Sequence, residues 1–399
     1  MRPIPATRLS GFYFAYYAAL GAFTPYWSLF LKARGQDVAA ISVLMSLWYA
    51  TRIVAPSSWS WLAERSPRPV RWLRIGCAIT FASFALFLLP IDFAGLFVAM
   101  CVFCFAYNAV MPQFEAITLS HLTGRSELYG RVRVWGSIGF ITVVAVFGLA
   151  FDHVPVTSLP LLMLPLYAGL LASSFCNDYG ADIPDASPAR TGFREHLLRR
   201  EVIIFFVVAL LTQISFGPYY TFFSLYLEQH AYRPSALGAY WTIGVAAEIL
   251  MFFLSARVFM RWEPTYVLVV ALVSASLRWW VTALLPDNIL LMALAQVTHA
   301  LNFAAFFAAC MQLLVRFFPG RLNGHGQGLY YGFSSGVGGV LGALLAGRLW
   351  AIDGGRTAFL VAGVIAALAT ILALLMLRPR RRPTSVGHCT DEDRREKLS

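Results

Sequence analysis

Three charged residues lie deep inside long apolar stretches of this sequence: Arg52, Glu248 and Arg278. A charge at the middle of a bilayer costs roughly 2.5–3.5 kcal/mol on insertion scales, so such residues point to a function by default. Arg52 could bind an anionic substrate or form an ion-pair gate; a structural salt bridge or snorkelling is the alternative. Glu248 could carry a proton, because burial disfavours the charged carboxylate, or it could be the fixed partner of one of the two arginines.

His299 and Asn302 form a second polar group within one apolar stretch. Residues three apart share one face of a helix, so both side chains are expected to point the same way. Beside Arg278 and Glu248 on neighbouring helices, His299 is a candidate proton relay, and we group Asn302 with it in proton coupling. The alternative is a histidine that only packs.

Other polar residues are candidates for substrate binding. Glu115 and Arg133 lie near the ends of two consecutive apolar stretches joined by a short basic loop, so adjacent antiparallel helices can bring them into contact. This pair could instead be purely structural. Asn108, Tyr17 and Tyr220 are predicted to face the same central cavity. The predicted substrate-binding set is therefore Arg52, Glu115, Arg133, Arg278, Asn108, Tyr17 and Tyr220.

Motifs of catalysis and metal binding are missing from the sequence. There is no nucleophile–base constellation, HExxH or Walker motif, and the glycines from Gly324 onward are not followed by GK[ST]. The six cysteines are scattered without zinc or disulfide spacing, and Cys101 and Cys104 lie inside an apolar run, where packing is expected. We expect neither an enzyme nor a metal or cofactor, and a proton gradient as the energy source.

Composition indicates what holds these residues in place. The 399 residues are 59% hydrophobic and 13% charged, whereas soluble domains carry about 25% charged residues. A transmembrane helix needs about 20 apolar residues, and the sequence predicts an all-α membrane protein with twelve of them. They are expected at 11–31, 39–62, 73–90, 93–119, 130–152, 157–176, 202–227, 235–258, 264–285, 288–312, 324–350 and 354–377. No cleavage site follows the first, which we expect to be retained.

The longest internal polar stretch divides the predicted helices six and six. We expect an N-terminal six-helix bundle at 1–177, a cytoplasmic linker at 178–201, a C-terminal six-helix bundle at 202–377 and a cytoplasmic tail at 378–399. Two six-helix halves around a midplane site are typical of major facilitator transporters.

The net charge of +11 is a signal of topology. With both termini inside, 24 of the 31 Lys and Arg residues lie on the cytoplasmic side, five lie outside and two lie within helices. This asymmetry predicts cytoplasmic termini and removes nucleic acid as a partner. We expect a monomer with several spans in the cell inner membrane, and the lipid bilayer, protons and a small molecule as its partners.

A faint internal repeat supports two related halves. Tyr26–Lys32 reads YWSLFLK and Phe222–Glu228 reads FFSLYLE, 196 residues later. With a one-residue gap, Thr51-Arg52 falls against Glu248-Ile249, so each half carries an ionisable residue at a similar depth of its second helix. Chance similarity of aromatic-rich helix ends is the alternative.

Two segments resemble lactose permease and its relatives: Pro112-Gln113-Phe114-Glu115-Ala116 and Tyr129–Ser137, which reads YGRVRVWGS. The resemblance implies an ion pair that orients substrate, carried by Glu115 and Arg133. Leu277-Arg278 and Thr298–Asn302 resemble segments of that family's ninth and tenth helices, with Asn302 at the position of a carboxylate that couples protons there.

The sequence is more similar still to the phenylpropionate permease family, which pairs an arginine on helix 2 with Ala-Glu on helix 8. Here these are Arg52 and Ala247-Glu248. The stretches Gly11–Gly21, Pro25-Tyr26-Trp27 and Gly326–Tyr330 resemble the same branch. The resemblance implies a twelve-helix major facilitator transporter.

The expected function is proton-coupled secondary transport of a small organic solute by alternating access. Arg52, Arg133 and Arg278 outnumber Glu115 and Glu248 by one, and a bound anion would relieve an unpaired buried cation. We therefore expect an aromatic or other carboxylate. The alternatives are proton symport of a neutral sugar or nucleoside, and a non-transporting sensor on the same fold.

Overall fold

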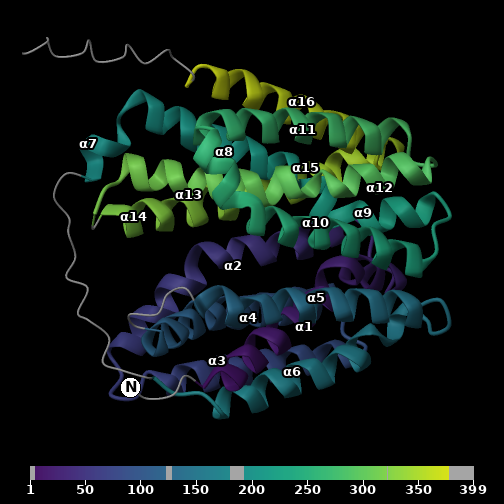
Figure 1. Cartoon of the computed structure of the whole chain (residues 1–399). Coiled ribbons are helices and arrows are strands. Elements are labelled where there is room, and N and C mark those ends of the chain that lie inside the picture. The colour runs from purple at the N-terminus through teal and green to yellow at the C-terminus, as the bar shows by residue number, and fades with distance from the viewer. Residues whose placement is uncertain (1–4, 123–127, 180–192, 321, 377–399) are drawn as a thin grey trace, which may run out of the picture.

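The computed structural model describes residues 5–122, 128–179, 193–320 and 322–376, and these residues form helices joined by short turns (Figure 1). The elements of the N-terminal half are α1 (Ala6–Ala33), α2 (Val38–Glu64), α3 (Val70–Ala85), η1 (Leu86–Leu88), α4 (Phe93–His121), α5 (Tyr129–Ala150), η3 (Val156–Ser158) and α6 (Leu159–Phe175). Those of the C-terminal half are α7 (Phe193–Leu197), α8 (Arg200–Ser215), α9 (Gly217–Gln229), α10 (Pro234–Arg261), α11 (Pro264–Leu284), α12 (Ile289–Val297), η4 (Ala300–Ala305), α13 (Phe306–Phe317), α14 (Leu322–Leu329), η5 (Tyr330–Val337), α15 (Gly338–Asp353) and α16 (Arg356–Leu374).

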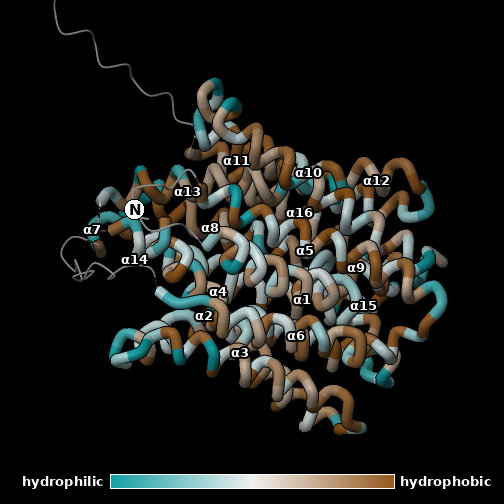
Figure 2. Tube along the Cα trace, turned by 60° about the horizontal axis from the view of Figure 1, so that its bottom comes forward, coloured by the Kyte–Doolittle hydropathy of each residue, from teal (hydrophilic) through white to brown (hydrophobic). Residues whose placement is uncertain are grey.

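Eleven helical segments in the described ranges are long and apolar enough to cross a membrane. The 28-residue α1 is not one of them; it packs against α5 and α6 and is buried over most of its length. Hydrophilic residues gather at the ends of the helices and in the turns, whereas their middle parts are mostly hydrophobic (Figure 2). The structure therefore has the pattern of a multi-pass membrane protein, and a twelfth crossing by α1 stays a prediction.

The two halves of the chain form separate layers in Figure 1, with α1–α6 below and α8–α16 above. Within the lower layer α2 packs on α4 and α1 on α5; within the upper layer α11 and α8 both pack on α16. The layers meet where α5 contacts α10, where α2 contacts α15 and η5, and where α1 contacts α9. The predicted boundaries of bundles, linker and tail stay predictions, and residues 180–192 and 377–399 lie outside the described residues.

Three helices differ from the expected uninterrupted α-helices. The helix expected at 202–227 is divided into α8 and α9 at Phe216, directly before Gly217-Pro218. Proline has no N–H to donate to the preceding turn, and a Cβ on Gly217 would lie 2.2 Å from the carbonyl oxygen of Gly342. The helices expected at 288–312 and 324–350 contain the π-helical segments η4 and η5. A uniform 3.6-residue period cannot reveal such segments, which are frequent at functional sites.

The halves are held together at one end of the molecule, here called the closed end. Lys32 Nζ and Glu228 Oε2 form an ion pair of 2.9 Å between the ends of α1 and α9. These residues are the last of the two repeated segments, 196 positions apart. In a pseudo-two-fold arrangement, corresponding residues of the two halves can touch only near the axis that relates the halves. The Lys32–Glu228 contact is consistent with such an axis.

Helices α5 and α10 add two further contacts at the closed end. A Cβ on Gly238 would lie 2.9 Å from the carbonyl oxygen of Val144 and 3.3 Å from Gly148 Cα, so only glycine permits this crossing. Asp152 accepts a hydrogen bond of 3.1 Å from the backbone N–H of Ser235, in the first turn of α10. Hydrogen bonds from Ser235 lower the pKa of Asp152, so this contact is kept at neutral pH and is lost as pH falls through that lowered value.

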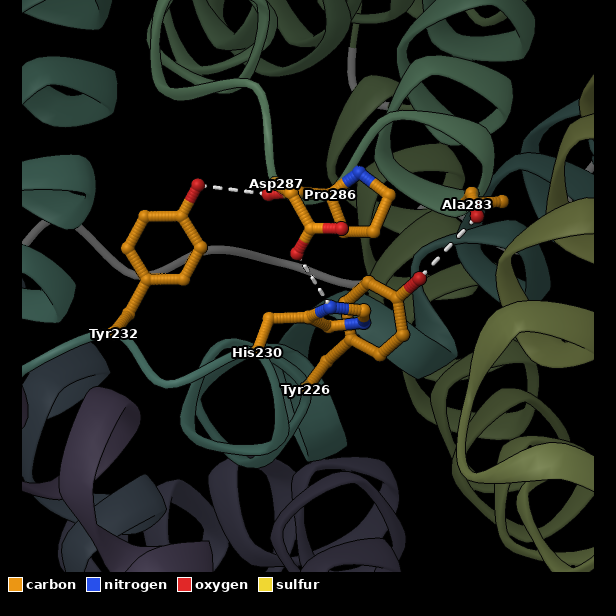
Figure 3. A network of polar contacts seen from close by, with 6 residues as sticks. All are labelled: Tyr226, His230, Tyr232, Ala283, Pro286 and Asp287. Carbon is orange, nitrogen blue, oxygen red and sulfur yellow. Dashed lines mark hydrogen bonds and ion pairs between the residues drawn. The ribbon is translucent and has the colours of Figure 1, made fainter.

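The same end of the C-terminal half carries the polar network of Figure 3. His230 Nδ1 lies 2.9 Å from Asp287 Oδ1, Tyr232 donates to the carbonyl of Pro286 at 2.7 Å, and Tyr226 donates to that of Ala283 at 3.3 Å. These contacts tie the turn after α9 to the turn between α11 and α12. After Gly244 no residue of α10 is fully buried, although Glu248 still contacts His299.

Candidate functional site

A central cavity of about 290 Å³ lies between the two halves. Its wall combines residues of α1, α2 and α5 with residues of α8, α9, α10, η4, α13 and η5. Half of its 26 lining residues are aromatic: Tyr17, Phe23, Trp48, Tyr49, Phe140, Phe216, Tyr220, Trp241, Phe303, Phe306, Phe307, Tyr330 and Tyr331. Such a wall favours a flat apolar ligand, which can stack on the rings or meet their edges.

Seven of the ten predicted site residues line this cavity: Tyr17, Arg52, Arg133, Tyr220, Glu248, His299 and Asn302. Glu115, Asn108 and Arg278 do not. The charged lining groups are two guanidinium groups and one carboxylate, so the cavity itself has an excess of one positive charge when His299 is neutral.

Arg133 is held by tyrosines. It donates a hydrogen bond to the Tyr17 hydroxyl, and its Cζ lies 4.0 Å from the centre of the Tyr17 ring. Gly136, one turn along α5, makes room for this contact, because a Cβ there would lie 2.7 Å from Tyr17 and 2.9 Å from Arg133. Glu115 instead accepts a hydrogen bond of 3.3 Å from the hydroxyl of Tyr129.

The predicted contact between Glu115 and Arg133 does not form as an ion pair. Lys32 and Glu228 form the one Lys/Arg–carboxylate ion pair among the described residues, whereas His230 contacts Asp287 and His299 contacts Glu248 in pairs that are ionic only when the histidine is protonated. Each charged group instead has a hydroxyl partner, Tyr129 for Glu115 and Tyr17 for Arg133. Their part in orienting substrate stays a prediction.

Arg52 is the more available of the two lining arginines. Its Cζ lies 5.5 Å from the centre of the Trp48 ring, and no hydrogen bond or ion pair joins it to any described residue. Asn108 lies behind it, outside the cavity. The Asn108 amide donates to the Trp48 carbonyl and to the Thr51 hydroxyl, both at 2.9 Å. Both N–H groups of Asn108 therefore hold α4 to α2, which is a structural task and leaves no donor for a substrate.

Glu248 contacts His299 rather than either arginine proposed as its partner. His299 Nε2 lies 3.5 Å from Glu248 Oε2, and Arg278 Nη1 lies 3.0 Å from His299 Nδ1. A guanidinium can only donate, so Nδ1 is the acceptor and the remaining ring hydrogen is on Nε2, facing Glu248. The three side chains form one chain in which neutral His299 separates the two charges.

Arg278 forms a second layer behind His299 and is 1% exposed. Its Nη2 donates to Gln296 Oε1 at 2.8 Å, and its Cζ lies 4.3 Å from the centre of the Tyr219 ring. The sequence prediction missed Gln296 and Tyr219. Gln296 could have been found, because it precedes His299 by three residues and so shares its helix face.

Comparison with known families decides where this arrangement belongs. A family model described as "MFS_1 like family" matches residues 6–361 of the 399. The chain belongs to the MFS_1-like family. This family match confirms the expected membership of the major facilitator superfamily, and the protein is a multi-pass membrane protein and a secondary transporter of small solutes.

Individual relatives of this MFS_1-like transporter cover most of its length. It is 27% identical over 310 residues to the "Probable 3-phenylpropionic acid transporter" of Escherichia coli (strain K12), covering 76% of this chain and 80% of the relative. It is 25% identical over 385 residues to the "Maltose permease" of Geobacillus stearothermophilus, covering 93% and 94%. The crystal structure of a mutant of the nucleoside transporter NupG superposes with a TM-score of 0.83 at 17% identity, over 94% of this chain and 100% of that one, which shows a shared fold.

Proposed function

We propose that this transporter carries a small aromatic carboxylate together with protons. The observation that supports this most is the composition of the central cavity: half of its lining is aromatic, and its charged groups are two arginines and one glutamate. The aromatic part of a ligand would pack among the rings. Its carboxylate would balance the excess positive charge, which is costly when it stays unpaired in a low-dielectric site.

Arg52 would bind the carboxylate. It faces the cavity and no described residue neutralises it, and a guanidinium presents two parallel N–H donors that match a carboxylate. Arg133 would add a second positive charge from α5 while Tyr17 holds its position.

Glu248 would carry the proton. While Arg278 donates to Nδ1 of His299, this ring cannot take a proton there without placing two donors face to face. Glu248 is the group next along the chain, and it lines the cavity. Entry of one proton with a monocarboxylate would make the cycle electroneutral. Asn302 is better suited to substrate binding than to proton coupling, because an amide does not titrate between pH 5 and 8.

Alternating access would follow from separation at the closed end. Contacts such as Lys32–Glu228 and Asp152–Ser235 join the halves there, whereas no residue of α10 after Gly244 is fully buried. We propose that α1 provides a twelfth crossing and that both termini lie in the cytoplasm, which places the closed end outside. A monomer in the cell inner membrane completes the proposed arrangement.

Binding and uptake by purified protein in proteoliposomes test this function. We expect saturable binding of 3-phenylpropionate, and accumulation driven by an imposed pH gradient. Arg52→Gln should raise Kd about 10–100-fold, since a hydrogen bond to a charged group contributes about 1.5–3 kcal/mol and 1.4 kcal/mol is tenfold. Arg65→Gln is the matched control, because Arg65 stacks on Trp61 as Arg52 does on Trp48, but at the exposed end of α2. Unchanged binding in Arg52→Gln would contradict the proposed anion site.

A neutral sugar or nucleoside is the second candidate. Relatives named for maltose and for a nucleoside support it, and aromatic walls also stack on sugars and bases. Saturable sugar or nucleoside binding that neither Arg52→Gln nor Arg133→Gln affects would favour this candidate. Counterflow of any of these solutes would exclude a non-transporting sensor.

A further inference from the structure

Asn302 is the one buried polar side chain of the cavity wall with unpartnered atoms among the described residues. It is 1% exposed, and neither its Nδ2 nor its Oδ1 has a hydrogen-bond partner in that part of the chain. The other buried amides nearby differ: Asn108 is bonded to α2, and Gln296 is bonded to Arg278. Among the described residues of the cavity wall, Asn302 alone keeps both a buried donor and a buried acceptor without a hydrogen-bond partner.

Such an arrangement is unfavourable in the empty protein. A buried amide without a hydrogen bond loses its contacts with water and gains nothing in return. Asn302 lies within η4, the π-helical segment Ala300–Ala305, and widened turns of this kind are often found at functional sites. An unpaired buried amide on an irregular helix segment is best explained by a partner that arrives from the cavity.

The chemistry of the amide indicates what that partner is. It offers a donor and an acceptor side by side without a charge, which matches a hydroxyl group, since a hydroxyl can accept from Nδ2 and donate to Oδ1. Phe303, Phe306 and Phe307 follow Asn302 on the same cavity wall, so a hydroxyl on an aromatic ring would place the ring among these side chains.

The position of Asn302 indicates which end of the substrate it would meet. Arg52 and Arg133 belong to α2 and α5 of the N-terminal half, whereas Asn302 belongs to the C-terminal half, and the cavity lies between them. We infer that Asn302 determines specificity by binding a ring hydroxyl at the end of the substrate remote from its carboxylate. The substrate class is then a hydroxylated aromatic carboxylate. This inference rests on the proposed function and narrows it.

Two kinds of acid that differ only by a ring hydroxyl test the inference. The probes are 3-phenylpropionate and its meta- and para-hydroxylated forms, with Kd measured by calorimetry on the purified full-length protein. We expect a hydroxylated form to bind the wild type at least about tenfold more tightly, which is about 1.4 kcal/mol. In Asn302→Leu the ratio should fall to about one, while Kd of the unsubstituted acid changes less than about threefold. Asn323→Leu is the control, because Asn323 is an amide of α14 outside the cavity.

The melting temperature of the ligand-free protein is a second readout, because the loss of a merely structural asparagine would lower it. Replacing an unpaired buried amide by leucine should leave it unchanged or raise it. A clear fall in both Asn302→Leu and Asn302→Ala would show that the amide is needed for folding and would overturn the inference.

The remaining outcomes separate this inference from the function on which it rests. An unchanged ratio in Asn302→Leu, or equal affinities of the wild type for all three acids, overturns the role of Asn302 but leaves aromatic carboxylate transport intact. If none of the acids binds the wild type, both the proposed function and the inference are overturned.

Discussion

The two walls of the central cavity use similar residues in different ways. On the wall from the N-terminal half, Arg52 and Arg133 contact aromatic side chains and form no ion pair with any described residue. On the wall from the C-terminal half, Arg278 is buried and joined through His299 to Glu248. An arginine thus remains available for an anion on one side, whereas on the other side the arginine is used to position a histidine and a carboxylate.

This difference indicates a division of tasks between related halves. Arg52 and Glu248 both line the cavity, each from the second membrane-crossing helix of its half. In the alignment with a one-residue gap they lie one position apart, and they carry opposite charges. In the proposed function one wall attracts the anion and the other takes up the proton.

The largest effect on the proposed difference between the two walls is expected from a substitution of Glu248. Glu248→Gln removes the proposed proton site, so accumulation driven by a pH gradient should fall to the equilibrium ratio of one while exchange of substrate persists. Uptake and counterflow in the same proteoliposomes measure both. Glu64→Gln, an exposed glutamate at the end of α2, is the matched control. Full gradient-driven accumulation in Glu248→Gln would show that this wall is not the coupling site.

A substitution of Gln296 tests whether the wall from the C-terminal half depends on the buried residues behind His299. Gln296→Leu leaves Nη2 of Arg278 without its acceptor, and an unsatisfied buried donor costs about 1–3 kcal/mol. We expect a lower melting temperature and a changed pH profile of transport, since Arg278 would hold His299 less firmly. Gln327→Leu removes an amide that bonds Asn323 away from the cavity and should leave the pH profile unchanged. Wild-type behaviour of Gln296→Leu would argue against a positioning role.

Tyr17 tests whether the first wall is held ready for an anion. Tyr17→Phe keeps the ring beneath Arg133 but removes its hydroxyl acceptor. Without this hydroxyl Arg133 is no longer held in position, so a carboxylate should bind about two- to tenfold more weakly, which is up to about 1.4 kcal/mol. Tyr167→Phe is the control, since the Tyr167 hydroxyl has no hydrogen-bond partner among the described residues and lies outside the cavity. Equal or tighter binding in Tyr17→Phe would show that the hydroxyl does not position Arg133.

The smallest effect is expected at the ion pair that joins the halves. Lys32 and Glu228 are about half exposed, so their coupling should be about 0.2–1 kcal/mol and should decrease with added salt. A double-mutant cycle on thermal stability with Lys32→Glu, Glu228→Lys and the charge-swapped double variant measures it. A double variant no more stable than the sum of its single changes would show that this pair does not couple the halves.

Much of the helical framework could be predicted from apolar runs and their punctuation. The turn Leu285–Asn288 is the weakest division in the sequence, yet α11 ends at Leu284, and Asn288 caps α12 by accepting a hydrogen bond from Leu291 N–H at 3.0 Å. The break at Phe216 was missed because the run from Arg200 to Gln229 stays apolar throughout, although Gly217-Pro218 is the local signal that could have predicted it. The π-helical segments could not be predicted from the apolar runs either, because these runs continue through both of them.

Much of the candidate site could be predicted for the same reason that the spans could. Polar residues such as Arg52, Glu248 and His299 stand out in apolar stretches because burying them is costly, and all three line the cavity. Asn108, Glu115 and Arg278 stand out equally, but they do not line it. Depth in a helix does not determine which neighbour a side chain meets.

The sequence by itself therefore determined that the protein spans a membrane with helices. It also determined which few polar side chains are costly to bury in the membrane and are therefore candidates for a function. Only the tertiary structure decided their partners: Tyr17 rather than Glu115 for Arg133, and His299 rather than an arginine for Glu248. The physical reason is that apolar burial depends on composition and can be read along one helix. A hydrogen bond of about 3 Å depends on how helices far apart in the chain are rotated and packed against each other.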